Sequence, residues 1–345
     1  MTISISYMED VNSWSHYLQH SNDASMYHQA GWKGVLEDTF KHKGFFWVAQ
    51  DQERVSGVLP LMLMKNSLFG SYLVSLPFID SAGILADNPA IARQLCDQAI
   101  ALAKEHQVDF LELRNLKKIE HDRLETMTHK VNFVLPLNPD PDFIWKKVVH
   151  ENIRNKVRKA KKNQLQVVMG SNLDLVDQFY RVFSKNMRDL GTPVYPKKYF
   201  KNLLRYFPDQ TKIFLVKYQD MVIGGKIVFC FKDTIFFIYH SSMRAFAKLA
   251  PNNLLYWAAV EYGCKSGFKY CNMGRSTVDS GPYYFKKQWG GEIRQLYFQY
   301  YLHNKKQLPQ LSPSNPKFAL AINLWKRLPL VITTTLGPLI AKHIP

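Results

Sequence analysis

Apolar positions along the first third of the chain follow two different periods. Residues 45–50 and 55–64 form apolar runs separated by a short polar turn, a pattern typical of two paired strands. A further apolar run at 72–77 predicts a third strand. Residues 90–106 instead repeat apolar side chains at helical spacing, and the run at 109–115 predicts a strand after that helix. The predicted order is therefore strand, strand, strand, helix, strand.

The same order returns in the second half of the chain. The predicted elements there are three strands, a helix and a strand, at 212–217, 222–231, 234–240, 254–266 and 269–273. Trp47 corresponds to Phe214 and Gly57 to Gly224, with the same separation of 167 residues. A pattern that repeats in this way predicts a duplicated unit.

We therefore expect an α/β fold with two tandem domains, each a mixed sheet flanked by helices. The first domain is predicted to span 1–135 and the second 136–305, with residues 306–345 as a separate tail. A length of 345 residues suits about two domains. The chain has 46% apolar and 21% charged residues, an ordinary globular composition that excludes a disordered chain.

The cysteines indicate a reducing compartment. Each lies in a mostly apolar or aromatic run, and no C-x-x-C pair occurs among Cys96, Cys230, Cys264 and Cys271. This pattern predicts buried thiols and no metal site. The first residues lack the order of a signal peptide, and no apolar run reaches about 18 residues. The chain is therefore expected in the cytoplasm, without a membrane span.

A net charge of +17 favours polyanionic partners such as nucleic acid, anionic lipid or phosphorylated substrates. Residues 142–163 concentrate this charge on a predicted amphipathic helix, in which only Asp142 and Glu151 oppose eight basic residues. Such a helix is either an ordinary solvated surface or a contact for a polyanion such as tRNA. The basic residues are Lys146, Lys147, Arg154, Lys156, Arg158, Lys159, Lys161 and Lys162.

The last residues form a second basic region. No acidic residue follows Glu292, whereas 293–345 contain seven lysines and arginines. Two apolar segments, 318–325 and 328–340, predict a pair of helices too broken to span a membrane. Residues 317–345 either pack on the body of the protein or lie on the inner face of the cytoplasmic membrane, against anionic lipid. We favour packing for the first helix and the membrane for the second.

The stretch from Tyr270 to Gly291 combines glycines, aromatic residues and positive charge. Its pattern predicts a strand that ends in Gly-Arg, a turn, a short helix and another strand. Loops at strand ends commonly carry chemistry on a rigid scaffold. Arg275 and Lys286 are therefore candidates for binding a charged group. The alternative is a structural turn in which Phe285 and Trp289 anchor the core.

Other candidates come from turns and from a helix start. His240 follows a predicted strand, where it is either a base or a structural residue. Asp189 precedes a Gly-Thr-Pro turn, where it either orients a substrate amine or holds the turn. Arg244 and Lys248 lie in the loop before the helix at 254–266, and a helix N-terminus attracts phosphate. That loop is a candidate site for the phosphates of an acyl carrier, although it contains no glycine.

Several stretches together resemble one protein family. They are Ile-Arg-Asn-Lys-Val-Arg-Lys-Ala at 153–160, Asn-Met-Arg-Asp-Leu-Gly-Thr-Pro-Val-Tyr at 186–195, Asn-Leu-Leu-Tyr-Trp at 253–257, and Gly-Arg-Ser-Thr at 274–277 with Phe-Lys-Lys-Gln-Trp-Gly at 285–290. Over nearly its whole length the chain is similar to the FemAB-like proteins associated with exosortase/PEP-CTERM systems. These belong with the FemAB and polysaccharide-locus acyltransferases, which have a duplicated GNAT fold.

The resemblance implies a tandem GNAT fold and an amide-forming acyltransferase. FemAB enzymes move an aminoacyl group from tRNA to an amine on a peptidoglycan precursor, and related polysaccharide-locus proteins resemble acyl-CoA transferases. By position, Lys286 resembles the lysine that FemAB enzymes place beside the carrier. The loop 243–253 departs from the glycine-bearing pyrophosphate loop of usual GNAT proteins, which leaves tRNA or another carrier open beside acetyl-CoA.

We therefore expect an acyl group to pass from aminoacyl-tRNA or acyl-CoA, as co-substrate, to an amine-bearing cell-envelope or exopolysaccharide precursor, without a tightly bound cofactor. Lys286 and Arg275 are expected to bind carrier phosphate or the developing oxyanion, with the lysine head exposed. Asp189 and His240 are candidates for handling the amine proton. The other candidates for binding substrate or carrier are Gly274, Ser276, Tyr283, Phe285, Trp289, Arg244, Lys248, Arg154 and Arg158.

Two rival functions remain open. One is an acetyl-CoA-dependent N-acetyltransferase that acts on a sugar amine, which CoA bound to the purified protein would favour. The other is a non-catalytic basic scaffold that binds nucleic acid or membrane. Activity that survives the loss of Lys286 and Arg275 would favour the scaffold.

Overall fold

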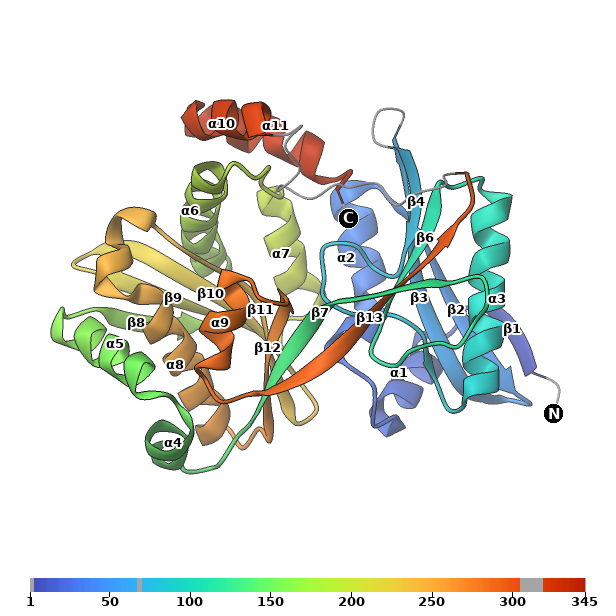
Figure 1. Ribbon diagram of the computed structural model, residues 1–345, viewed down its shortest axis with the longest axis horizontal. Helices are drawn as coiled ribbons and strands as arrows, with labels where there is room; N and C mark the ends of the chain where they lie inside the picture. Colours follow the sequence, from blue (N-terminus) through green and yellow to red (C-terminus); the bar gives the residue numbers. More distant parts are fainter. Residues whose placement is uncertain (1–2, 67–69, 305–318, 345) are drawn as a thin grey trace. The chain divides into compact units, whose positions relative to one another are not determined.

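The computed structural model describes residues 3–66, 70–304 and 319–344 (Figure 1). These residues divide into two compact units. Unit 1 contains 3–131, 295–304 and 343–344, and unit 2 contains 132–294 and 319–342. The sequence pattern instead predicts 295–304 as part of the second domain. These residues join unit 1 because they pair with its strand at 110–115. The predicted domain limits at 135 and 305 stay predictions.

Unit 1 is a mixed sheet with helices. Its helices are α1 (Val11–His20), the 3-10 turn η1 (Met26–His28), α2 (Gly31–Phe40) and α3 (Pro89–Glu105). Its strands are β1 (Ile3–Tyr7), β2 (Lys43–Asp51), β3 (Arg54–Asn66), β4 (Gly70–Val74), β5 (Leu85–Ala86), β6 (Phe110–Asn115) and parts of β7 (Glu125–Pro136) and β13 (Glu292–Leu302). The order is β1-β2-β3-β4-β6-β13-β7, with β5 beside β3, and the pair β4–β6 is parallel.

One core cluster of unit 1 lies between α3 and the sheet. Asn88 caps this helix because its side chain accepts a hydrogen bond from Ile91 N at 3.0 Å, and Pro89 occupies the first turn. The apolar face of α3, which includes Leu95 and Ala99, belongs to one buried cluster with side chains of β2, β3 and β6. The predicted helical spacing over 90–106 therefore identified a real core face.

Unit 2 has the same kinds of elements. Its helices are α4 (Pro141–Phe143), the π-helical turn η2 (Ile144–Val148), α5 (Glu151–Lys162), α6 (Leu173–Leu190), α7 (Lys197–Tyr206), the 3-10 helix η3 (Arg244–Leu249), α8 (Pro251–Lys265), α9 (Gly281–Lys287), α10 (Ala319–Arg327) and α11 (Leu330–Ala341). Its strands are β8 (Gln166–Gly170), β9 (Thr211–Tyr218), β10 (Met221–Phe231), β11 (Thr234–Ser242) and β12 (Tyr270–Thr277). The order is β7-β12-β11-β10-β9-β8, and the pair β11–β12 is parallel.

The two units repeat one hairpin with the same register. Ala49 pairs with Gly57 in β2–β3, and Val216 pairs with Gly224 in β9–β10, so both partners keep the separation seen in the sequence. In each hairpin the residue just before that glycine is left out of the ladder as a bulge. The shared register and the shared bulge confirm the predicted α/β fold of two similar units.

The predicted helix over 142–163 is wrong as one continuous element. The chain leaves the helical conformation at Val149, whose ψ is 127°, and α5 begins only after His150. The His150 ring caps α5 by accepting a hydrogen bond from Asn152 N at 3.2 Å. The break escaped detection because apolar residues keep an approximately helical spacing across it.

Two predicted strand limits are also corrected. The strand expected over 72–77 ends at Val74, because the backbone turns at Leu76, where φ is 54°. The strand expected to end near Gly-Arg instead continues to Thr277. Gly274, with φ of 79°, lies inside this strand, a conformation that glycine adopts without strain.

Candidate functional site

Two neighbouring parallel strands of unit 2 separate partway along their length. β11 and β12 pair at three positions, from Thr234 with Tyr270 to Phe236 with Asn272. Beyond these positions both strands continue, but the ladder between them ends. The backbone groups that would have continued the ladder therefore need partners from elsewhere.

Lys286 binds two backbone carbonyls of β12 beyond the end of this ladder. This residue lies on α9, which begins where the Ser280 side chain accepts a hydrogen bond from Tyr283 N at 3.3 Å. Its Nζ donates to the carbonyl oxygens of Gly274 at 2.8 Å and Arg275 at 2.9 Å. Lys286 is only 5% exposed, so the expectation of an exposed head is wrong. The lysine is buried because the separated strand offers carbonyl acceptors inside the unit.

A second lysine in this region was not anticipated. Lys226, in the middle of β10, has no exposed surface, and its Nζ lies 3.5 Å from the ring centre of Tyr256 and 4.0 Å from that of Phe237. Among the described residues, this Nζ has no hydrogen-bond partner. Burial lowers the pKa of Lys226 well below its usual range, and the charge of Lys286 lowers it further. This shift favours the neutral form of the amine.

His240, on β11, adds a third nitrogen group. Its ring contacts the ring of Tyr256 with centroids 5.5 Å apart. Desolvation by the surrounding protein, with positive charge from the neighbouring lysines, lowers the pKa of His240 below its usual value. The side chain remains exposed to solvent, so its desolvation is partial. The imidazole is neutral at pH 7. We call Lys226, His240, Tyr256 and Lys286 the amine cluster.

The predicted loop residues lie around the amine cluster in unequal settings. Ser276 is buried, and its Oγ has no hydrogen-bond partner among the described residues. Arg275 is half-buried, so its carbonyl is used by Lys286 while its side chain keeps access to solvent. Backbone N–H of Gly274 donates to Asn272 Oδ1 at 2.9 Å. Of these predicted residues, Ser276 is thus a buried hydroxyl and Arg275 a half-buried side chain.

The aromatic residues of the loop mainly pack. Trp289 has no exposed surface, and its ring lies 5.4 Å from Tyr256 and 6.2 Å from Phe285. Phe285 in turn lies 4.9 Å from Tyr256, and Tyr283 lies 5.3 Å from Phe133. These contacts hold α9 against the sheet of unit 2 and keep the lysine amines dry.

Three further predicted residues, Asp189, Arg244 and Lys248, lie at the end of α6 and in η3. Asp189 Oδ1 accepts hydrogen bonds from Arg188 at 3.0 and 2.8 Å, which leaves it paired with a neighbouring cation. Arg244 is exposed and donates to the backbone oxygen of Asp189 at 3.3 Å. Lys248 is also exposed. The structure therefore brings Arg244 to Asp189 and shows no contact of either, among the described residues, with the amine cluster.

The basic residues of α5 divide into a buried contact and an exposed face. Arg154 donates to the backbone oxygens of Trp145 at 3.4 Å and Lys146 at 2.9 Å, and so ties η2 to α5. Arg158 lies 5.9 Å from the ring centre of Trp145 and is exposed. The inner face of α5 packs on α8, so the lysines on its outer face meet solvent.

Lys226 is the functional candidate that the sequence reasoning missed. Its signal was available, because one lysine interrupts the otherwise apolar strand Val222–Phe231. A charged residue in such a run is buried only if something compensates it or removes its charge. Tyr256 was also missed, since an aromatic residue in an apolar helix reads as ordinary core.

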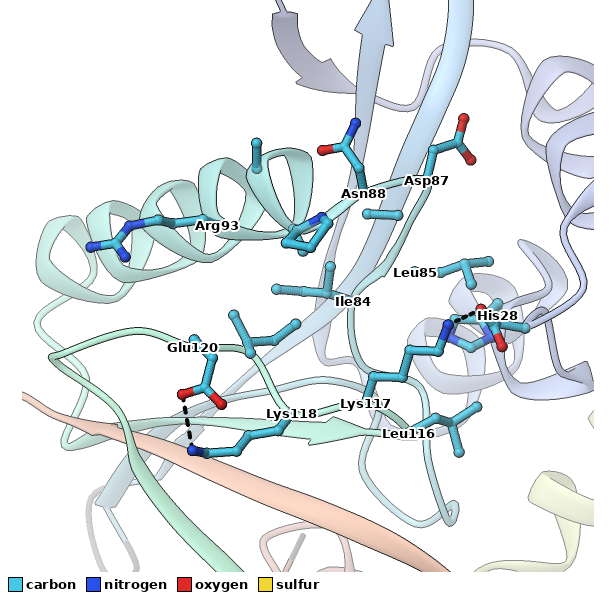
Figure 2. A pocket seen from close by; sticks show the side chains of 16 residues that line it. His28, Ile84, Leu85, Asp87, Asn88, Arg93, Leu116, Lys117, Lys118 and Glu120 are labelled. Atoms are coloured by element: carbon cyan, nitrogen blue, oxygen red, sulfur yellow. Dashed lines mark hydrogen bonds and ion pairs between the residues drawn. The ribbon is translucent and has the colours of Figure 1, made fainter.

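Unit 1 contains a cavity of about 520 Å³ beside the first turn of α3 (Figure 2). Its lysines are already paired, Lys117 with Asp23 at 2.5 Å and Lys118 with Glu120 at 2.9 Å. His28 is buried there, and burial lowers the pKa of its imidazole to about 4. With its lysine charges neutralised inside the unit, this cavity is a weaker candidate than the amine cluster. Among the described residues, no group of His, Cys, Asp and Glu could hold a metal ion.

The comparisons with known proteins place the amine cluster inside a recognised domain. Residues 147–287 match the family model described as the acetyltransferase (GNAT) domain. Lys226, His240, Tyr256 and Lys286 all lie within this range. Unit 2 therefore contains a GNAT domain. No curated protein sequence matches the chain.

Solved structures extend the similarity over both units. FemX is 14% identical, with a TM-score of 0.69 over 88% of this chain and 98% of FemX. A tandem GNAT protein from the clavulanic acid biosynthesis pathway is 11% identical, with a TM-score of 0.57 over 89% of this chain and all of that one. The C-terminal domain of a putative lysylphosphatidylglycerol synthetase from Agrobacterium fabrum is 10% identical, with a TM-score of 0.57 over 86% of this chain and 92% of that one. The fold is therefore tandem GNAT-like, as the family resemblance implied.

Proposed function

We propose that this protein transfers an acyl or aminoacyl group from a carrier to an amine of a cell-envelope or polysaccharide precursor, forming an amide. The observation that carries the proposal is the amine cluster, which lies where β11 and β12 separate inside the GNAT domain. A dry site with a fixed positive charge suits a reaction in which negative charge develops on a carbonyl oxygen. The exosortase setting implied by the family resemblance is part of the same proposal.

The chemistry assigns distinct roles within the cluster. The acceptor amine attacks the carbonyl carbon, a C–N bond forms, and the ester or thioester bond to the carrier breaks. The leaving oxygen or sulfur takes up a proton. The Lys286 ammonium, held by two carbonyl oxygens, supplies positive charge for the oxyanion. Exposed His240 is the residue of the cluster that can accept the proton that the attacking amine loses, although its lowered pKa makes it a weak base.

Lys226 acts through its neighbours and not on the substrate, because it has no exposed surface. Two ammonium groups close together in a dry interior repel each other, and the lowered pKa of Lys226 favours Lys286 as the charged member of the lysine pair. Tyr256 covers the Lys226 amine and contacts the His240 ring. Lys226 is therefore a positioning residue for the groups that meet the substrate.

Aminoacyl-tRNA is the carrier that the charge distribution favours. The outer face of α5 exposes five basic residues, and Glu151 is the one acidic residue of this helix. If they contact phosphates, tRNA binding weakens as salt rises, and each lost contact lowers the log–log slope by about 0.7–0.9. Unchanged affinity and slope after charge removal would exclude this face as the tRNA contact. The five residues are Lys156, Arg158, Lys159, Lys161 and Lys162.

The test is a transfer assay with two carriers in parallel. Wild-type protein is incubated with an extract of envelope precursors and either tRNA charged with labelled amino acids or labelled acetyl-CoA. Alkali-stable label in the precursor fraction measures amide formation, because mild alkali hydrolyses the carrier ester. We expect label from tRNA, and its loss in Lys286→Met but not in the neighbouring Lys287→Met. Label from acetyl-CoA alone would mean that acetyl-CoA, and not aminoacyl-tRNA, is the carrier. No stable label from either carrier would contradict the proposed function.

A further inference from the structure

The C-terminal helix of unit 2 exposes its large apolar side chains and covers its small ones. On α11, Thr333, Gly337 and Ala341 are buried. Val331 is 76% exposed and Leu339 is 58% exposed, and Ile332 and Leu336 are exposed as well. A helix that packs on a protein and faces water has the opposite arrangement, with its large apolar residues inward. Something other than water is therefore expected on the outer side of α11.

The covered side of α10 and α11 rests on α6 and the residues that follow it (Figure 1). A Cβ added at Gly337 would come within 2.9 Å of Val194 N, and one added at Gly191 would come within 2.5 Å of Ile322 Cγ2. These close approaches determine which side of each helix packs on unit 2. The helices therefore pack on the body of unit 2, as the first alternative for the tail predicts, and they still expose large apolar side chains.

Positive charge borders the exposed apolar side chains. Lys326 and Arg327 are exposed at the junction of α10 and α11, and Lys342 follows α11. The sequence contains no acidic residue after Glu292, so no carboxylate of the tail opposes this charge. We call the exposed apolar and basic residues of these helices, together with half-buried Lys342, the tail surface. It consists of Leu320, Leu324, Lys326, Arg327, Val331, Ile332, Leu336, Leu339 and Lys342.

We propose that the tail surface docks the protein on an anionic lipid bilayer. Among the described residues, no helix is long and apolar enough to cross a membrane. The helices would instead lie in the plane of the interface, with apolar side chains among the upper acyl chains and basic residues among anionic headgroups. A second copy of this chain suits the surface less well, because two such surfaces would bring like charges together. This proposal is independent of acyl transfer.

Vesicle sedimentation of the full-length protein tests the proposal. The vesicles contain phosphatidylcholine alone or phosphatidylcholine with anionic phosphatidylglycerol. We expect binding at least about tenfold stronger to the anionic vesicles, with weakening at high salt. The triple variant Val331→Gln, Leu336→Gln, Leu339→Gln should lose binding to both vesicle types. The variant Lys326→Gln, Arg327→Gln, Lys342→Gln should lose the preference for anionic lipid and the salt dependence.

A matched control uses an exposed apolar residue of unit 2 outside the tail. Leu173 is 53% exposed, and Leu173→Gln should leave vesicle binding unchanged. Circular dichroism of each variant identifies any loss of folding. A wild-type protein that does not sediment with anionic vesicles would overturn the proposal. So would a dimer in solution that the apolar triple variant converts to monomer, since a second copy would then cover the surface.

Discussion

The two units treat the same strand junction in opposite ways. In unit 1, β4 and β6 pair in parallel at three positions, from Tyr72 with Phe110 to Val74 with Glu112. In unit 2, β11 and β12 also pair in parallel at three positions. Unit 1 has a buried ion pair at this junction, whereas unit 2 has the amine cluster there. The comparison separates the parts of the duplicated fold that stabilise it from the parts available for chemistry.

The charged side chains at the junction of unit 1 find their partners within unit 1. Arg114 Nε lies 2.5 Å from Glu112 Oε1, and Arg114 Nη1 donates to Ile79 O at 2.8 Å and Leu76 O at 3.4 Å. Both ionised side chains are buried, the arginine at 2% exposure. In each unit the first parallel pair includes Phe110 of β6 or Tyr270 of β12. Four residues further along the strand, unit 1 has Arg114 and unit 2 has Gly274, whose carbonyl accepts a hydrogen bond from Lys286. A cation thus serves both junctions: Arg114 pairs with a carboxylate, and Lys286 donates to two backbone carbonyls.

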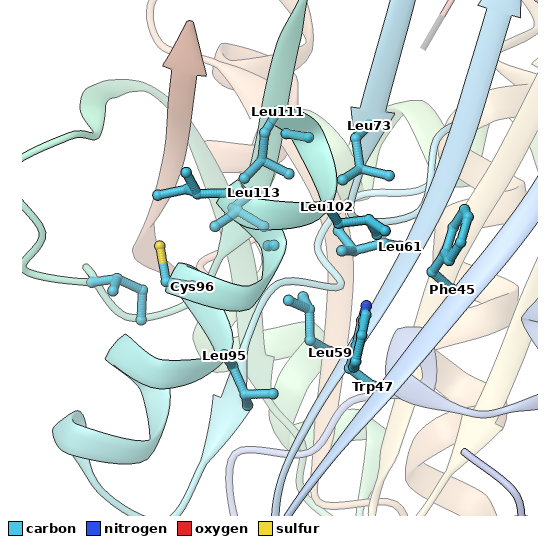
Figure 3. Close-up of a cluster of buried hydrophobic side chains, with 14 of the residues drawn as sticks. Phe45, Trp47, Leu59, Leu61, Leu73, Leu95, Cys96, Leu102, Leu111 and Leu113 are labelled. Atoms are coloured by element: carbon cyan, nitrogen blue, oxygen red, sulfur yellow. The ribbon is translucent and has the colours of Figure 1, made fainter. Parts of the chain in front are cut away.

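The hairpins show the same contrast at one equivalent position. Trp47 pairs with Leu59 in unit 1, and Phe214 pairs with Lys226 in unit 2, at the shared separation of the repeat. Leu59 belongs to the apolar cluster under α3 (Figure 3). Leu59 and Lys226 both have no exposed surface. A buried amine without a hydrogen-bond partner costs stability that a leucine would not. Such departures from the rules of folding are expected at functional sites.

The largest expected effect is on the ion pair of unit 1. Arg114→Met leaves Glu112 as an uncompensated buried carboxylate and should lower the free energy of unfolding by about 3–5 kcal/mol. Urea unfolding measures this change. Carrier binding by the folded fraction should be unaffected. A selective loss of carrier binding at unchanged stability would place the chemistry in unit 1 instead.

The pH dependence of stability should report the buried histidine of unit 1. The pKa of His28 falls from 6.5 to about 4 on folding, so the unfolded state binds more protons between these values. The free energy of unfolding should therefore fall as pH is lowered through this window, by roughly 3 kcal/mol in total. Urea midpoints at pH 7 and pH 5 measure the effect, and equal slopes for wild type and His28→Gln would contradict it. His240 acts in the same direction, but less, because it is accessible.

Lys286→Met should affect both chemistry and stability. Loss of the ammonium should slow transfer about tenfold to a hundredfold. Loss of its hydrogen bonds to Gly274 and Arg275 should also lower the free energy of unfolding by about 1–3 kcal/mol, in contrast to the negligible loss expected for an exposed head. Transfer rate and urea midpoint are measured on the same samples, with the exposed Lys287→Met as control. Equal losses in the two variants would indicate a diffuse basic patch.

Lys226→Leu gives unit 2 the residue that unit 1 has at the equivalent position, Leu59, and should produce the smallest change. Replacing an unpartnered buried amine with an apolar side chain should raise the free energy of unfolding by about 1–2 kcal/mol. Transfer should slow through kcat, with the KM for the carrier unchanged, because Lys226 acts through its neighbours. A variant that is destabilised, or that transfers normally, would remove Lys226 from the proposed mechanism.

The sequence specified the repeat better than the site. The apolar spacing, and the separation of 167 residues that Gly57 and Gly224 share with Trp47 and Phe214, were sufficient to predict the order of the strands. Both signals reflect local patterns. The burial of Lys286 was not predictable, because it depends on two carbonyls that become free only when β11 and β12 separate. The break before α5 depends on a histidine cap. Lys226 was visible as an interruption of an apolar strand, and its surroundings came only with tertiary structure.

The central claim is that carriers bind at the separated strands of unit 2. Hydrogen–deuterium exchange with and without aminoacyl-tRNA, and in parallel with acetyl-CoA, tests it directly, because both units report in one experiment. The account predicts protection in peptides covering 237–242, 273–277 and 281–288. It predicts none at the equivalent junction of unit 1, in peptides covering 75–82 and 112–115. Protection confined to the unit 1 peptides, or absent from 273–288 with both carriers, would contradict it.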